Sequence, residues 1–157
     1  MAESVITSDQ HRALAVEANN ATWALLTTVR EARAAGGDHS VTGLVRGAYA
    51  AAYHWERATG FTLANEARAR YLIGQAWLSS GRPELALDYG DRTLAVCRDA
   101  GLADFDLAYA HELRARGLAA LGREAEARQA WLAAKAVPIA DPEDRAIVEA
   151  DFADAPV

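Results

Sequence analysis

The side chains with the widest chemical repertoire are few and scattered along this chain. The histidines and the single cysteine are His11, His39, His54, His111 and Cys97. No histidine belongs to a His-x3-His pair or a Glu-x-x-His motif, the spacings that helical bundles use to hold metal ions. The sequence also lacks a Gly-x-Ser-x-Gly motif, a glycine-rich phosphate loop and a Cys/His nucleophile signature. We therefore predict no metal site, no cofactor and no catalytic residue, and favour a non-enzymatic protein.

Another group of side chains is suited to binding. Asn19 and Asn20 fall inside a predicted helix, where asparagine is unfavourable because its amide competes for backbone hydrogen bonds. Trp23 follows one turn later, opposite the apolar stripe of that helix. A ligand pocket explains these residues, and a helix packed between two layers explains them equally well. The next helix carries His54 and Trp55 and should lie antiparallel beside the first. A pocket, if one forms, is therefore expected within reach of both Asn20 and His54.

His111 completes this group and has two interpretations. It shares an apolar stripe with Leu107, Ala115 and Leu118. It is either a core histidine bonded to a carboxylate or carbonyl, or a pocket base whose pKa is set by burial. The candidate pocket residues are Asn19, Asn20, Trp23, His54, Trp55, Trp77 and His111. Cys97 is expected to be a small core residue. The paired acids at Asp104 and Asp106 are explained by helix capping.

Apolar residues recur at helical spacing throughout, which predicts an all-α fold. The expected helices span residues 8–35, 41–59, 66–80, 83–99, 104–121, 124–137 and 142–152. Their predicted caps are Ser8 or Asp9, Ser40, Asn65, Asp104 and Asp141. The first helix is expected to continue through Asn19 and Asn20, although a second helix starting at Ala21 is the alternative. The last helix offers Ile147, Val148 and Phe152 and should cap the preceding helices.

A helical hairpin is repeated in the second half of the chain. NEARARYLIGQAWLSSG followed by RPELALDYGDRTLAV corresponds to YAHELRARGLAALG followed by REAEARQAWLAAKAV, and the turn glycines Gly81 and Gly122 lie 122 − 81 = 41 residues apart. The register pairs Gly74 with Ala115, Trp77 with Leu118 and Ala86 with Ala127. A small residue, a large filler, a turn glycine and an alanine in this order resemble tetratricopeptide repeats, over roughly residues 67–138. Trp77 and Trp131 are expected to be buried.

The resemblance implies a short solenoid of antiparallel helical hairpins with a C-terminal capping helix. Such arrays bind extended peptides on the concave face formed by their first helices. Carried over to this chain, the inward positions are Arg68, Tyr71, Gln75, Tyr109, Glu112 and Arg116. The alternative is that these side chains form an ordinary solvated face, on which Glu112 and Arg116 pair at i, i+4.

Composition narrows the classes of partner. The chain has 157 residues, 52% of them apolar, and a net charge of −6. One domain over 1–157 is expected, made of a helix pair at 1–60, two repeat-like pairs at 65–137 and a cap with its tail at 141–157. The negative charge disfavours nucleic acid and anionic membranes as partners. The N-terminal sequence lacks a signal-peptide pattern and no apolar run is long enough to span a bilayer, so with its lone cysteine we expect a cytoplasmic protein.

These observations favour an adaptor or scaffold module that binds a protein or peptide segment. The first alternative is a small-molecule-binding or catalytic helical domain built on the candidate pocket. The second is a structural domain that self-associates, as a homodimer, through an outer face carrying Tyr49 and Tyr53.

Overall fold

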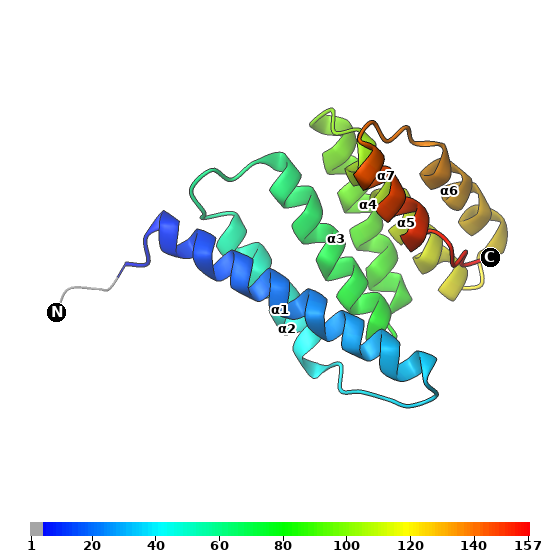
Figure 1. Cartoon of the computed structure of the whole chain (residues 1–157), viewed down its shortest axis with the longest axis horizontal. Coiled ribbons are helices and arrows are strands. Elements are labelled where there is room, and N and C mark those ends of the chain that lie inside the picture. Colours follow the sequence, from blue (N-terminus) through cyan, green and yellow to red (C-terminus); the bar gives the residue numbers. More distant parts are fainter. Residues whose placement is uncertain (1–4) are drawn as a thin grey trace.

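The computed structural model describes residues 5–157 and contains seven α-helices and no strand among them. The helices are α1 (Ser8–Ala34), α2 (Thr42–Trp55), α3 (Leu63–Ser79), α4 (Pro83–Asp99), α5 (Asp104–Ala120), α6 (Glu124–Ala136) and α7 (Pro142–Asp151). Figure 1 shows them stacked as successive hairpins from the N-terminal to the C-terminal end. The prediction of an all-α fold of stacked helical hairpins is confirmed.

The turns that close the two repeated hairpins have the same geometry. Gly81 and Gly122 adopt φ values of 76° and 74°, a left-handed conformation that side chains disfavour. In each turn the amide of the following arginine donates to the carbonyl five residues earlier, at 3.0 Å onto Trp77 and at 2.9 Å onto Leu118. The two turns that the 41-residue register aligns are therefore structurally equivalent.

Two helices begin upstream of their predicted caps. α1 starts with a capping box, in which Thr7 Oγ1 accepts from the Gln10 amide at 3.2 Å and Gln10 Oε1 accepts from the Thr7 amide at 2.8 Å. α3 starts in the same way with Thr62 and Asn65. Asn65 is thus the third residue of its helix and not its cap, because its side chain reaches back to satisfy the amide of the true cap. The caps predicted for these two helices are wrong.

The first helix is continuous, as the favoured interpretation expected. α1 runs through Asn19 and Asn20 without a break. The Asn19 amide nitrogen donates to Asn20 Oδ1 at 3.3 Å, so these side chains bond to each other and leave the helical backbone intact. α2 is shorter than predicted and ends at Trp55, since the chain turns there and the Thr59 amide donates to Ser8 O at 3.1 Å.

The odd-numbered helices form one layer of the stack. α1 contacts α3, α3 contacts α5, and α5 contacts α7, while α2, α4 and α6 each pack against their neighbours in the chain. Three fully buried leucines, Leu26, Leu44 and Leu72, hold α1, α2 and α3 together. The side chains that project from the outer side of α1, α3 and α5 consequently face one common surface.

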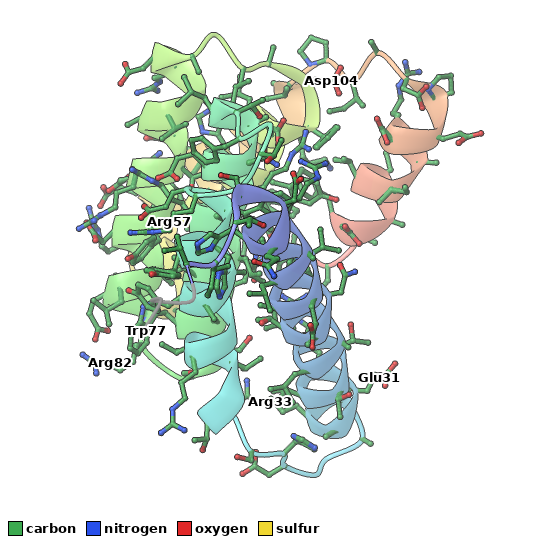
Figure 2. The ribbon with its side chains drawn as sticks, turned by 90° about the vertical axis from the view of Figure 1, so that its left-hand side faces the viewer. Glu31, Arg33, Arg57, Trp77, Arg82 and Asp104 are labelled. Carbon is green, nitrogen blue, oxygen red and sulfur yellow. The ribbon has the colours of Figure 1, made fainter. Side chains whose placement is uncertain are left out.

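The tryptophan predictions are half right. Trp131 is buried, with 6% of its surface exposed, and belongs to the core between α5, α6 and α7. Trp77 is only partly buried, because its indole reaches the surface and its Nε1 donates to the Tyr49 hydroxyl at 3.4 Å. Figure 2 shows Trp77 at the edge of the molecule with Arg57 and Arg82.

The last helix packs differently from a simple continuation of the stack. α7 contacts α5, and it reaches α6 through side chains, with the Phe152 ring 5.1 Å from that of Trp131. Val148 and Phe152 are buried as expected, whereas Ile147 is 58% exposed. In Figure 1, α7 crosses in front of α5 and does not continue beyond α6. α7 therefore covers one end of the odd-helix layer.

Close helix packing in the second half depends on glycine. A Cβ placed on Gly117 would lie 3.1 Å from the backbone nitrogen of Leu87 and 3.2 Å from its Cα. A backbone cannot move aside as a flexible side chain can, so the close approach of α4 and α5 requires that residue 117 has no side chain. The same holds at Gly90, where a Cβ would lie 3.1 Å from the backbone nitrogen of Arg114.

Gly117→Ala should therefore lower stability by about 1–3 kcal/mol, the usual cost of overpacking, although alanine favours helix by about 1 kcal/mol. Urea unfolding measures the change. Gly43→Ala is the matched control, because its nearest neighbour is the movable Cδ2 of Leu25 at 3.1 Å. Equal stability of the Gly117→Ala and Gly43→Ala variants would contradict this account of the α4–α5 contact.

Candidate binding groove

A cavity of about 770 Å³ opens on the odd-helix layer. α1, α3 and α5 supply most of its lining, and the end of α7 with the following residues supplies one edge. Its main side chains are Asn19, Trp23, Thr27, Arg30, Arg68, Tyr71, Gln75, Phe105, Asp106, Tyr109, Glu112, Arg116, Asp151 and Asp154. All six residues of the predicted peptide-binding face line this one cavity. That they bind a partner stays a prediction.

The groove side chains form three successive rows along the helices, here called levels. The first level is an ion pair between α3 and α5. Arg68 meets Asp106 with both prongs of its guanidinium, Nε to Oδ1 at 2.8 Å and Nη2 to Oδ2 at 3.0 Å. The same guanidinium lies 5.0 Å from the centre of the Phe105 ring. Asp104 and Asp106 were both assigned to helix capping from the sequence, and this assignment is wrong. The N-cap of α5 is Ala103, without a side-chain cap bond, and the Asp106 carboxylate is engaged by Arg68.

The second level is a row of aromatic rings. Trp23 stacks on Tyr71 at 6.0 Å, Tyr71 meets Tyr109 at 5.4 Å, and Tyr109 meets Phe152 edge to face at 5.6 Å. Phe152 then leads to the buried Trp131. The rings come in turn from α1, α3, α5, the residue that follows α7, and α6. A continuous aromatic floor thus crosses the groove from its α1 edge to its α7 edge.

The third level is a hydrogen-bond network around Glu112. Its Oε2 accepts from the Tyr71 hydroxyl at 3.0 Å and from Gln75 Nε2 at 3.2 Å, and its Oε1 pairs with Arg116 Nε. Gln75 Oε1 accepts from Arg30 Nη2 at 2.7 Å. Gln75 and Glu112 are buried, with 1% and 4% of their surfaces exposed. The alternative of an ordinary solvated face is therefore wrong for these two residues, which are buried and support the floor from beneath.

Burial sets the proton affinities of this network. It raises the pKa of Glu112, while the Arg116 guanidinium acts in the opposite direction. Burial and then the Glu112 carboxylate raise the pKa of the Tyr71 hydroxyl well above its ordinary value. Burial and then the hydrogen bond to Asp151 raise the pKa of Tyr109. Both tyrosines are consequently neutral hydrogen-bond donors at physiological pH.

The residues predicted to line one pocket do not lie together in the structure. Asn19 and Trp23 line the groove, but Asn20 is exposed and does not. His54 also lies outside the groove, where its Nδ1 meets His11 Nδ1 at 2.7 Å. The expectation of one pocket within reach of Asn20 and His54 is wrong, because a one-residue step along α1 turns Asn20 away from the face that carries Asn19.

The remaining pocket candidates also lie elsewhere. Trp55 is covered by the Arg12 guanidinium, 5.8 Å from the ring centre, and Trp77 is on the side of the even-numbered helices. His111 is half-buried, and its Nδ1 has no hydrogen-bond partner. Burial, followed by Arg114 and Arg98, lowers the pKa of His111. Neither a carboxylate nor a carbonyl bonds to this nitrogen, contrary to the first interpretation of His111.

Several groove residues escaped sequence reasoning, Arg30, Asp151 and Asp154 among them. Arg30 could have been found, because it continues the spacing of Asn19, Trp23 and Thr27 along one face of α1. Asp151 and Asp154 had no such signal, since their place depends on α7 folding back onto α5.

Comparison with known proteins gives no match to a protein family, a curated protein or a solved structure. Within residues 5–157 no cluster of three or more histidine, cysteine or acidic side chains could hold a metal ion. None of the helices described for this chain has the length and apolar character needed to cross a membrane.

Removing the Glu112 carboxylate should destabilise the groove. In Glu112→Leu the Arg116 guanidinium, the Tyr71 hydroxyl and the Gln75 amide lose their partner, and breaking a buried ion pair in this way costs about 3–5 kcal/mol. Urea unfolding at neutral pH measures the loss. The control Glu126→Leu breaks the exposed pair with Arg123 and should leave stability unchanged. A Glu112→Leu variant as stable as the control would contradict the role assigned to the network.

The His11–His54 contact should make stability depend on pH. One nitrogen must donate and the other accept, so at least one ring is neutral. Burial, then His11 and Arg57, lower the pKa of His54 below 6.5. As the pH falls through 6.5 the unfolded chain gains a proton first, so stability should drop until the lowered folded-state pKa is reached. Urea unfolding at pH 7.5 and 5.5 should show a smaller drop in His54→Asn than in the parent chain. His39→Asn, in an exposed loop, controls for the loss of one histidine, and an equal effect of both substitutions would count against the pair.

Proposed function

We propose that this chain is a non-enzymatic, tetratricopeptide-like module that binds an extended protein segment in the groove of α1, α3 and α5. The observation that carries the proposal is the aromatic floor, which runs unbroken across three successive odd-numbered helices. Extended peptides lack an apolar core of their own and bind through side chains that enter aromatic or apolar depressions, with polar groups fixing their register.

The groove is also organised before any ligand enters. Tyr71 and Tyr109 donate their hydroxyls to Glu112 and Asp151, at 3.0 Å and 2.5 Å, so their rings are held in place. A floor whose rotamers are already fixed loses little conformational entropy on binding, which leaves more of the contact energy for affinity. Both oxygens of Glu112 accept internal bonds, which supports a structural role for this carboxylate over a catalytic one.

A cytoplasmic location and a protein partner fit the remaining features. Cys97 is fully buried and burial raises its pKa to about 11, so it behaves as a core residue and not as a reactive thiol. The net charge of −6 disfavours nucleic acid as the partner.

The cavity volume favours a second candidate, a small aromatic or polar metabolite. About 770 Å³ lies within the range of roughly 300–1,000 Å³ typical of ligand pockets. The two candidate ligands would cover different lengths of the aromatic floor. A small molecule would occupy one part of it, and a peptide would cross all of it. Titration of tryptophan fluorescence with a metabolite library would detect the small ligand through Trp23.

Trp23→Ala tests the peptide-binding proposal. Random dodecapeptides displayed on phage would be selected on the intact chain, and the selected peptides made with a fluorescent label. Fluorescence anisotropy should show that Trp23→Ala weakens their binding by about tenfold or more, because a central aromatic anchor carries much of such an interface.

Tyr53→Ala is the matched control. Tyr53 is an aromatic residue of α2 that is 52% exposed and lies outside the groove. Binding lost in Tyr53→Ala and kept in Trp23→Ala would move the interface to the outer face and remove the groove proposal. Tyr71→Ala is unsuitable for this test, because loss of its bond to Glu112 would itself weaken the fold.

A further inference from the structure

One of the three arginines that line the groove, Arg30 at its α1 edge, has no direct ion pair among residues 5–157. Three arginines line the cavity, and Arg68 and Arg116 are neutralised by Asp106 and Glu112. Arg30 donates to the neutral Gln75 amide oxygen and forms no ion pair with any carboxylate in residues 5–157. The next residue, Glu31, is acidic. In Figure 2 Glu31 and Arg33 lie on opposite sides of the end of α1.

The α7 edge carries the opposite charge. Asp151 and Asp154 line the cavity there, and neither forms an ion pair within the part of the chain that the structure describes. Asp151 accepts a hydrogen bond from Tyr109, and the backbone oxygen of Asp154 accepts one from Arg116 at 3.1 Å. Segment 141–157 contains six acidic residues and one arginine, a net charge of −6 + 1 = −5 out of −6 for the whole chain.

The two edges are separated by a distance that a short peptide can cover. Arg30 lies on α1, and Asp154 is held against α5 by Arg116, so the two charges lie two helix spacings apart with α3 between them. At about 8–10 Å per packed pair this is roughly 16–20 Å, which an extended chain rising about 3.3 Å per residue spans in five or six residues. The Gln75 and Glu112 network lies between the charged edges, and the aromatic floor runs beside it, one turn away along α3 and α5.

We propose that the groove selects an extended segment of a partner protein with opposite charges at its two ends. An acidic side chain of the partner pairs with Arg30, and a basic side chain five or six residues away pairs with Asp154 and Asp151. Apolar side chains between them pack on Trp23, Tyr71 and Tyr109. This inference rests on the proposed peptide-binding function and adds the chemical class and orientation of the ligand.

Charge complementarity of this kind gives specificity. An acidic group brought to the Asp151 and Asp154 edge, or a basic group brought to Arg30, would meet a like charge, which disfavours the wrong segment or the wrong orientation. The exposed guanidinium and carboxylate groups at these edges also form stronger hydrogen bonds with charged partners than with neutral ones.

Selection of random dodecapeptides on phage against the intact chain tests the inference. The selected peptides whose binding depends on Trp23 should carry Asp or Glu and Lys or Arg five or six positions apart. In fluorescence anisotropy, Arg30→Glu and Asp154→Arg should each weaken their binding by about tenfold. Replacing the acidic residue of the peptide by arginine should restore binding to Arg30→Glu.

Arg46→Glu and Glu124→Arg are the matched controls, because they make the same charge changes at exposed residues outside the groove. Arg30→Gln repeats the test without adding a negative charge near the Glu112 network, and urea unfolding checks each variant for stability.

Trp23-dependent peptides that lack the charge pattern, or that bind the charge-changed variants within twofold of the parent, would overturn the inference and leave the peptide-binding function standing. Failure to select any Trp23-dependent peptide would overturn both.

Discussion

The Glu112 carboxylate is the centre of a buried hydrogen-bond network that joins α1, α3, α5 and the residues after α7. It accepts bonds from α3 through Tyr71 and Gln75 and pairs with Arg116 on its own helix. Gln75 then reaches Arg30 on α1, and Arg116 reaches the backbone at Asp154. A buried carboxylate is costly unless its lone pairs are satisfied, so the network has one arrangement that meets this demand. The spacing of α1, α3 and α5 follows from that arrangement.

The position of α7 is the second constraint on the groove. Phe152 packs against both Tyr109 of α5 and Trp131 of α6, and the backbone of α7 lies over α5 and not over α6. Because of this placement the acidic tail becomes one edge of the groove, and the outer side of α6 stays open, with Leu132 62% exposed. A terminal helix placed in line with the stack would have covered α6 and left the groove without the carboxylates of Asp151 and Asp154.

The sequence predicted the helices well because their signals are local. Periodicity, Pro83 at a helix start and the glycines after α3 and α5 mark elements without knowledge of their neighbours. The repeat register also located six groove residues, since it fixes which side of α3 and α5 faces outward. It could not show that Gln75 and Glu112 lie beneath the floor, because burial depends on the side chains of α1 and α7 that cover them.

The failures have equally specific causes. Asn20 was grouped with Asn19, although a helix turns by about 100° per residue and separates their faces. In the second repeat, Leu118 occupies the position equivalent to Trp77 and is buried. Trp77 itself lies beside Tyr49 and stays partly exposed. Arg30 was overlooked because the candidate pocket residues of the first helix ended at Trp23, whereas the groove continues along the same face to Thr27 and Arg30.

Two sets of groove side chains are suited to different tasks: those bonded to one another supply affinity, and the charged ones at the edges supply specificity. Tyr71, Tyr109, Gln75 and Glu112 are committed to internal bonds, so they supply shape and apolar contact. Arg30 and Asp154 lie at the edges without ion pairs and can discriminate between ligands. Because such edge charges are partly solvated, salt should weaken their contribution, whereas the contact with the aromatic floor should depend little on salt. Binding to this groove would then lose selectivity before it loses affinity as ionic strength rises.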